Sequence, residues 1–187
     1  MSDLSLRSKA AVRAELLAAR RSRTDRAAAD AAVRAALALL AADLGTVAGY
    51  VPLPNEPGGA LLPGLLASAC RRLLLPVVRP DRDLDWAVYD GTLAPAGYGL
   101  SEPPGPRLGP AAITEAELVV VPAVAVDRSG VRLGRGGGSY DRALARVGPG
   151  TLLVAVLYPG ELVDRLPAEH HDVRVHAVVT PDGLTRL

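Results

Sequence analysis

Hydrophobic and polar positions follow a helical spacing over the first quarter of the chain. Residues 6–23 contain few helix breakers and place apolar side chains three and four positions apart. Residues 24–44 form an alanine-rich run that starts with Thr24 and Asp25, and residues of these types are common at helix N-termini. The pattern therefore predicts two helices before any strand.

Short, continuous apolar runs follow and predict buried strands. They are TVAGYVPL (46–53), LLLPVV (73–78), ELVVVPAVAVD (117–127), TLLVAVLY (151–158) and VHAVVT (175–180). Residues 84–91 alternate like a strand with one exposed face. Two shorter helices are predicted, one at residues 60–72 with Pro63 in its first turn and one at residues 139–147 with Ser139 as its N-cap.

The order of these elements indicates the fold class. Apolar strands that alternate with helices are typical of a mostly parallel β-sheet with helices on both faces. Residues 92–112 are dense in proline and glycine and predict an irregular loop. No internal repeat or linker divides the chain, so we expect one domain over residues 1–187. The predicted fold is α/β with three layers, a mostly parallel sheet and two N-terminal helices.

Composition narrows the function classes. The 187 residues are 49% hydrophobic with a formal net charge of +1, so no global field attracts nucleic acid or an anionic membrane. Cys70 is the single cysteine, which excludes an intramolecular disulfide. No apolar run reaches the roughly 20 residues of a membrane-spanning helix, and the N-terminus lacks an apolar signal segment. We expect a cytoplasmic, monomeric protein whose partners are small molecules.

The stretch GVRLGRGGGSYDR (130–142) carries the candidate chemistry. Consecutive glycines let backbone N–H groups approach an anion, and the helix that follows adds its positive end. Arg132 and Arg135 supply donors suited to phosphate oxygens. A tight structural turn explains the same glycines equally well. The loop lacks the lysine of a Walker A motif, and Ser139 stands where a dinucleotide fingerprint requires glycine.

Asp141, at the start of the predicted helix, has two interpretations. An acid in a first helical turn stabilises the helix through its dipole, and spacing alone favours this explanation. Beside a phosphate site, an aspartate can also bind Mg²⁺ together with phosphate oxygens. Both interpretations remain open from the residues alone.

Several stretches resemble one known family. VPAVAVDRSGVRLGRGGGSYDRAL resembles the signature of the 5-formyltetrahydrofolate cyclo-ligase family, whose loop reads roughly RLGRGGGYYDR. The resemblance continues, in chain order, through KAAVR (9–13), YVPLPNE (50–56), GYGLSEP and LPAEHHDVRVHAVVT (166–180). It implies an enzyme that converts 5-formyltetrahydrofolate to 5,10-methenyltetrahydrofolate with ATP and Mg²⁺, and that releases ADP and phosphate.

The resemblance also implies roles for individual residues. Lys9, Arg132 and Arg135 would be catalytic. The residues that would hold ATP are Lys9, Arg13, Arg132, Gly134, Arg135, Gly136, Gly137, Gly138, Ser139 and Tyr140. Val51, Glu56 and Tyr140 would contact the folate. Asp141 would bind Mg²⁺, with Asp172 as a second, weaker candidate.

Two departures from the family pattern, at Ser139 and His176, bear on these roles. Ser139 replaces the first of two adjacent aromatic residues, and we consider Tyr98 or Trp86 as a substitute ring. His176 stands where the family often has an acid. His170 and His171 could suggest zinc, although adjacent histidines on a polar loop are more often solvent-exposed.

Three other functions remain open. A diverged relative could keep the ATP site and act on another formyl or carboxyl compound. A non-catalytic module could bind RNA through its arginine and glycine residues, although the near-neutral charge and the brevity of the segment oppose this. A sugar-phosphate isomerase would use the phosphate loop without ATP.

Overall fold

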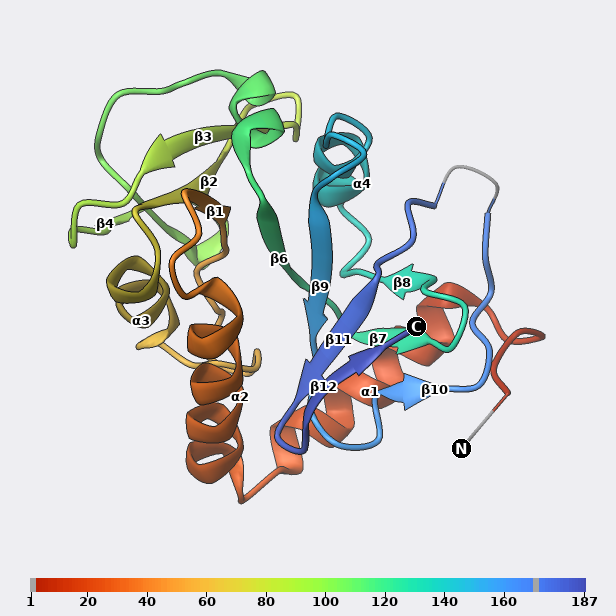
Figure 1. The fold of residues 1–187 in the computed structure, drawn as a ribbon. Helices are drawn as coiled ribbons and strands as arrows, with labels where there is room; N and C mark the ends of the chain where they lie inside the picture. The colour runs from red at the N-terminus through yellow and green to blue at the C-terminus, as the bar shows by residue number, and fades with distance from the viewer. Residues whose placement is uncertain (1–2, 170–171) are drawn as a thin grey trace.

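A computed structural model describes residues 3–169 and 172–187 and shows a seven-stranded central sheet (Figure 1). Its strand order is β12-β11-β9-β6-β1-β2-β3. The strands are β1 (Thr46–Ala48), β2 (Arg72–Val78), β3 (Leu84–Val88), β6 (Leu118–Pro122), β9 (Leu152–Val156), β11 (Ala177–Thr180) and β12 (Gly183–Arg186). The five inner strands are parallel, and β3 and β12 pair antiparallel at the two edges. The predicted α/β class is confirmed.

Helices cover both faces of this sheet. Helices α2 (Arg26–Ala41) and α3 (Leu62–Ala69) pack on one face. The short 3₁₀ helix η2 (Pro110–Glu115) and α4 (Ser139–Leu144) pack on the other. Strand β6 shows why both faces are apolar, since Leu118 and Val120 contact the first layer and Val119 and Val121 contact the second. Three layers result, as predicted.

A small second sheet carries the first helix. Strands β10 (Leu162–Val163), β7 (Ala125–Asp127) and β8 (Arg132–Leu133) form it, and α1 (Lys9–Ser22) packs against it through Val12 (Figure 1). The Ser8 side chain caps α1 by accepting a hydrogen bond from the Ala11 N–H. The two N-terminal helices therefore lie on different sheets.

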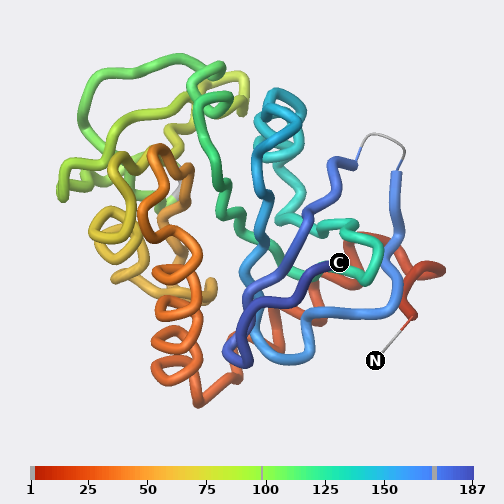
Figure 2. The backbone as a smooth tube through the Cα atoms, in the orientation of Figure 1, coloured from red at the N-terminus to blue at the C-terminus, as the bar shows by residue number. Residues whose placement is uncertain are grey.

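Residues 92–109 form an irregular connection that bends away beyond β3 (Figure 2). It contains only a short hairpin of β4 (Ala94–Pro95) and β5 (Ser101–Glu102) around the 3₁₀ helix η1 (Gly97–Gly99). The predicted loop is therefore confirmed up to the start of η2. Pro63 lies in the first turn of α3, also as predicted.

Several predicted boundaries are wrong. The run at residues 117–127 is two strands, because the chain breaks after β6 and continues as β7 in the small sheet. The run at residues 46–53 is a strand only to Ala48, and the segment after it is irregular. Asp25 occupies the N-cap of α2 without a side-chain hydrogen bond. Gly138, with φ of 71°, caps α4, so Ser139 is the first helical residue and not the cap.

The topology places many loops along one edge of the central sheet. Strands β1, β2 and β6 are parallel neighbours, so the segments that leave them begin at the same edge. Parallel sheets bind ligands at this carboxyl edge. No helix among residues 3–169 and 172–187 is long and apolar enough to cross a lipid bilayer.

Candidate active site

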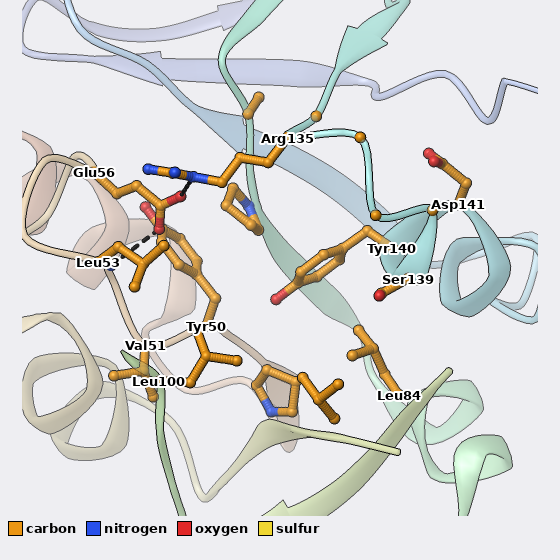
Figure 3. A pocket seen from close by; sticks show the side chains of 18 of the residues that line it. Tyr50, Val51, Leu53, Glu56, Leu84, Leu100, Arg135, Ser139, Tyr140 and Asp141 are labelled. Atoms are coloured by element: carbon orange, nitrogen blue, oxygen red, sulfur yellow. Dashed lines mark hydrogen bonds and ion pairs between the residues drawn. The ribbon is translucent and has the colours of Figure 1, made fainter. Parts of the chain in front are cut away.

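A cavity of about 230 Å³ opens at the carboxyl edge of the sheet (Figure 3). One wall follows β1 and includes Tyr50, Val51, Leu53 and Glu56. The opposite wall is the glycine loop from Gly134 to Gly138 and the start of α4. The remaining lining comes from the ends of β2, β3 and β6 and from the β5 hairpin: Pro76, Val78, Leu84, Leu100, Ser101, Glu102, Pro122 and Ala123. Segments distant in sequence thus share one cavity.

The glycine loop owes its shape to two positive φ angles. Gly136 has φ of 96° and Gly138 has φ of 71°, which other residues adopt at a cost. Arg13 on α1 supports the loop from outside, since its Nε donates to the Gly134 carbonyl at 2.8 Å. A side chain at Gly136 would contact this guanidinium at 3.5 Å. Arg13, which is predicted to hold ATP, therefore contacts the glycine loop, although it does not line the cavity.

Arg132 lies beneath the loop on β8, and its side chain is only 3% exposed. Its guanidinium donates to the Pro122 carbonyl at 3.2 Å and to the Asp141 carboxylate at 2.5 Å. Among the described residues, its buried Nε has no partner. Asp141 is 40% exposed at the rim. The arginine is thus held in place, while the carboxylate beside it stays accessible.

Glu56 projects from the opposite wall and is 6% exposed. One of its carboxylate oxygens accepts a hydrogen bond from the Leu53 N–H at 3.0 Å. The other accepts from Arg135 Nε at 2.7 Å, and this ion pair spans the two walls (Figure 3). The Arg135 side chain is 43% exposed. The ion pair therefore joins the fixed carboxylate of Glu56 to the solvent-accessible guanidinium of Arg135.

Two tyrosines face the space between the walls. Burial, and then the nearby negative charge of Glu56, raise the pKa of Tyr140 and of Tyr50 above the ordinary value. The Tyr50 hydroxyl donates to the Pro57 carbonyl at 2.6 Å. The buried Tyr140 hydroxyl has no partner within residues 3–169 and 172–187, and Figure 3 shows it directed into the cavity. Tyr140 is therefore a neutral phenol that can donate a hydrogen bond to a ligand.

Lys9 and Asp172 lie together but outside the cavity lining. Lys9 Nζ contacts Asp172 at 3.1 Å and Glu169 at 3.0 Å. Partial burial acts to lower the Lys9 pKa, but the hydrogen bonds to these two acids raise it overall. Lys9 and Arg13 are both on α1, one helical turn apart, as the sequence predicts.

The two candidate metal ligands are not gathered in one place. Asp141 lines the cavity and Asp172 does not. Among the described residues, no group of three histidine, cysteine, aspartate or glutamate side chains is placed to hold a metal ion. His170 and His171 lie outside the described residues.

The structure tests one of the two rings considered as a substitute for the aromatic missing at Ser139. Trp86 is fully buried in the core and does not line the cavity. The Tyr98 side chain lies outside the described part of the chain. Tyr50 lines the cavity instead, and sequence reasoning missed it. His176 accepts a hydrogen bond from the Leu153 N–H and is likewise absent from the lining.

Glu102 is a second missed residue. It lines the cavity, and its carboxylate accepts from the Val78 N–H at 2.8 Å. The sequence carries a signal for both missed residues, since Tyr50 opens YVPLPNE and Glu102 lies in GYGLSEP.

A cavity at the carboxyl ends of parallel strands, bordered by a glycine loop with two arginines and by a buried carboxylate, defines an α/β enzyme that acts on small molecules. The model of the 5-formyltetrahydrofolate cyclo-ligase family matches residues 5–181. The 5-formyltetrahydrofolate cyclo-ligase of Mycolicibacterium smegmatis is 44% identical over 186 residues, which cover 95% of this chain and 96% of the relative. The chain therefore belongs to the 5-formyltetrahydrofolate cyclo-ligase family and is an enzyme of the ligase class.

Solved structures agree with this assignment. The 5,10-methenyltetrahydrofolate synthetase of Aquifex aeolicus superposes with a TM-score of 0.77 at 29% identity, over 96% of this chain and 92% of that chain. A 5,10-methenyltetrahydrofolate synthetase from Mycoplasma pneumoniae gives a TM-score of 0.74 at 20% identity, over 93% and 99% of the two chains. This second likeness supports the fold. The family resemblance and the fold predicted from the sequence are both confirmed.

Proposed function

We propose that this enzyme converts 5-formyltetrahydrofolate to 5,10-methenyltetrahydrofolate, using ATP and Mg²⁺ and releasing ADP and phosphate. The observation that carries the proposal is that two unlike walls share one cavity. One wall has backbone N–H groups and arginines suited to phosphates, and the other has a buried carboxylate suited to the N–H groups of a pterin ring.

The chemistry requires these two walls to meet. A formyl group on nitrogen is a poor electrophile, and its oxygen is a poor leaving group. In the proposed reaction the formyl oxygen attacks the γ-phosphorus and ADP departs. N10 then attacks the formyl carbon, loses its proton, and phosphate leaves as the ring closes. The protein must hold the two substrates in line and neutralise charge on the transferred group.

On the phosphate wall, we assign charge neutralisation to Arg132 and Arg135 and backbone contacts to the glycine loop. The support is that Arg132 is buried, fixed at Pro122 and carries an unpartnered Nε among the described residues. Lys9 and Arg13 would approach the phosphates from α1, since Arg13 already contacts the loop. Lys9 would exchange an acid partner for a phosphate oxygen.

On the folate wall, we assign the pterin N–H groups to Glu56 and packing contacts to Val51 and Tyr140. The support is the low exposure of Glu56 and the fixed orientation that Leu53 gives its carboxylate. A buried acceptor whose geometry is fixed discriminates strongly, because a ligand that lacks the matching donor leaves it unpaired. Ser139 lines the cavity beside Tyr140, at the position where the family pattern has a second aromatic ring.

The bond from Arg135 Nε occupies one oxygen of Glu56, which leaves that oxygen less available to the N–H groups of a pterin ring. The cavity of about 230 Å³ is also smaller than the ~300 to 1,000 Å³ typical of ligand pockets. We therefore infer that ligand binding separates this ion pair. Nucleotide phosphates would draw Arg135 away and free Glu56, so that each substrate binds more tightly in the presence of the other.

Asp141 fits a magnesium site of the kind that nucleotide enzymes use. Mg²⁺ commonly binds one or two carboxylates together with phosphate oxygens and water, and Asp141 offers one accessible carboxylate at the rim. Bound magnesium would neutralise phosphate charge. Asp172, which is held by Lys9 outside the cavity lining, remains the weaker candidate.

The test is the formation of 5,10-methenyltetrahydrofolate from 5-formyltetrahydrofolate, followed by the near-ultraviolet absorbance of the product. ATP and Mg²⁺ are each omitted in turn. Product that depends on both supports the proposal. Absence of product with both present, while ATP still binds, would mean that the enzyme acts on a different formyl or carboxyl substrate.

A further inference from the structure

A row of polar side chains on α2 faces the segment that carries Glu56. Helix α2 is otherwise rich in alanine, and it buries Val33 and Leu37 against the sheet. Arg26, Asp30 and Arg34 are spaced by four residues, so they lie on one side of the helix. All three reach the same short segment, residues 54–59. The three side chains on α2 therefore all contact one segment, residues 54–59.

Each member of the row binds a different part of this segment. Arg26 donates to the Asn55 side chain and, at 3.4 Å, to the Pro54 carbonyl. Asp30 Oδ1 accepts from the Gly58 N–H at 2.9 Å, and Arg34 donates to the Gly58 carbonyl at 2.9 Å. Both backbone groups of Gly58 are thus held by α2.

Asp30 also ties the segment to the central sheet. Its Oδ1 accepts a second hydrogen bond, at 2.9 Å, from the hydroxyl of Tyr158. Tyr158 follows β9 and is 1% exposed, and the Arg23 guanidinium lies 4.9 Å from the centre of its ring. The same hydroxyl lies 3.4 Å from the Glu56 carbonyl oxygen. One carboxylate oxygen of Asp30 therefore joins helix, sheet and segment beside Glu56.

The segment needs such an anchor because of its own sequence. Gly58 and Gly59 have φ of 96° and 61°, and glycines in these conformations lose much freedom on folding. Only Pro57 separates Glu56 from Gly58, so displacement of Gly58 moves the carboxylate. The Asp30 carboxylate oxygens leave little space here, since a side chain at Gly59 would meet Asp30 Oδ2 at 3.0 Å.

We propose that Asp30 is a positioning residue for the folate half of the reaction, which it serves by holding Gly58 and Tyr158 so that the Glu56 carboxylate faces the cavity. The proposal rests on the proposed function, because it takes Glu56 as the folate acceptor. Asp30 does not line the cavity, so its effect reaches the substrate through the segment that it holds, in which Glu56 lines the cavity.

The test compares Asp30→Ala with Asp30→Asn in steady-state kinetics. Asp30→Ala should raise the KM for 5-formyltetrahydrofolate about tenfold, because hydrogen bonds to a charged acceptor are lost beside Glu56. Its KM for ATP should change less than about twofold. Asp30→Asn keeps an acceptor oxygen and should restore most of the folate KM. Tyr158→Phe removes one of the two bonds to Asp30 and should give a smaller rise.

A second readout separates this proposal from the proposed function. Asp30→Ala should accelerate amide hydrogen exchange at Gly58, and Asp30→Asn should do so less. Unchanged folate KM in an active Asp30→Ala enzyme overturns the positioning role, as does an equal rise in both KM values. If the wild-type enzyme does not turn over the folate, the proposed function fails, and unaltered exchange at Gly58 would overturn the positioning role as well.

Discussion

The two walls of the cavity are held in place by very different means. In the Glu56 wall, every residue from Leu53 to Gly58 takes part in a hydrogen bond, with α2, with Tyr50 or within the segment itself. Among the described residues, the glycine loop receives one side-chain hydrogen bond from another element, from Arg13 to the Gly134 carbonyl, and Arg135 crosses from the loop to Glu56. A wall with few ties can move at small cost. The comparison indicates a rigid wall on the proposed folate side and an adjustable wall on the proposed phosphate side.

The largest expected effect concerns the adjustable wall. Lys9→Ala should lower kcat/KM for ATP on the order of a hundredfold, because a charge that meets the transferred phosphoryl group is lost. The fold should persist, since partly exposed ion pairs contribute at most about 1 kcal/mol. Turnover at varied ATP checks this result. Arg7→Ala, which removes an exposed cation paired with Glu15, is the matched control. Unaltered ATP use in Lys9→Ala would remove α1 from the phosphate wall.

The next effect concerns the rigid wall. Glu56→Gln should raise the KM for 5-formyltetrahydrofolate by roughly ten- to a hundredfold, because a charged acceptor becomes a neutral amide. With 5-formyltetrahydrofolate saturating, so that Arg135 is already released from position 56, the KM for ATP should stay within about twofold. Kinetics with each substrate varied in turn measure both values, and Glu115→Gln, at an exposed ion pair with Arg72, is the control. Equal losses for both substrates would show that the two walls do not divide the substrates.

A smaller effect tests the contact between the walls. In the wild type, a non-hydrolysable ATP analogue should tighten folate binding about 5- to 150-fold, the usual range for coupled sites. Arg135→Ala should reduce this coupling to less than about twofold and tighten folate binding without nucleotide, since Glu56 is then free. Calorimetric titration measures both constants. Arg128→Ala, at an exposed ion pair with Asp164, should keep the coupling. Full coupling in Arg135→Ala would contradict the release of Glu56.

Much of the fold follows from the sequence because apolar periodicity reflects burial. The parallel core strands and the two N-terminal helices are predicted in order, since each apolar run must find a buried face. The division of residues 117–127 into β6 and β7 is not predictable in this way. Both halves are apolar because both are buried, and only the topology shows that they belong to different sheets. Gly138 takes the cap of α4 from Ser139 through a positive φ, which periodicity does not report.

In the candidate site, too, features that depend on neighbouring residues are predictable from the sequence, and features that depend on tertiary contacts are not. The glycine loop can be predicted from the sequence as a candidate phosphate site, because its chemistry depends on consecutive residues. The ion pair between Glu56 and Arg135 joins positions 79 residues apart, and no local pattern predicts it. Asp30 is harder still, since an acid on an alanine-rich helix resembles a solvated residue until its contacts with Gly58 and Tyr158 are known. Tertiary contacts therefore decide which polar residues serve the cavity.

The smallest expected effect is a pH dependence at Tyr140, where the two walls meet. Burial and the charge of Glu56 raise its pKa above the ordinary value of 10.0, so the folded protein keeps a proton that the unfolded chain releases above pH 10. The unfolded state then binds fewer protons, and stability falls as pH rises, by up to about 1.4 kcal/mol per pH unit. The Tyr140→Phe variant has no phenol at this position and should not show this loss of stability.

Urea unfolding of both proteins, from about pH 8 to about pH 11, measures the difference, and the raised pKa values of Tyr50 and Tyr158 cancel because both proteins keep these residues. Phenylalanine fits the site at neutral pH, since the Tyr140 hydroxyl has no partner among the described residues. The free energy of unfolding of the wild type should therefore fall relative to that of the variant only above about pH 10. A constant difference across this range would mean that the phenol is already in contact with water, so that the space between the walls is open before any substrate binds.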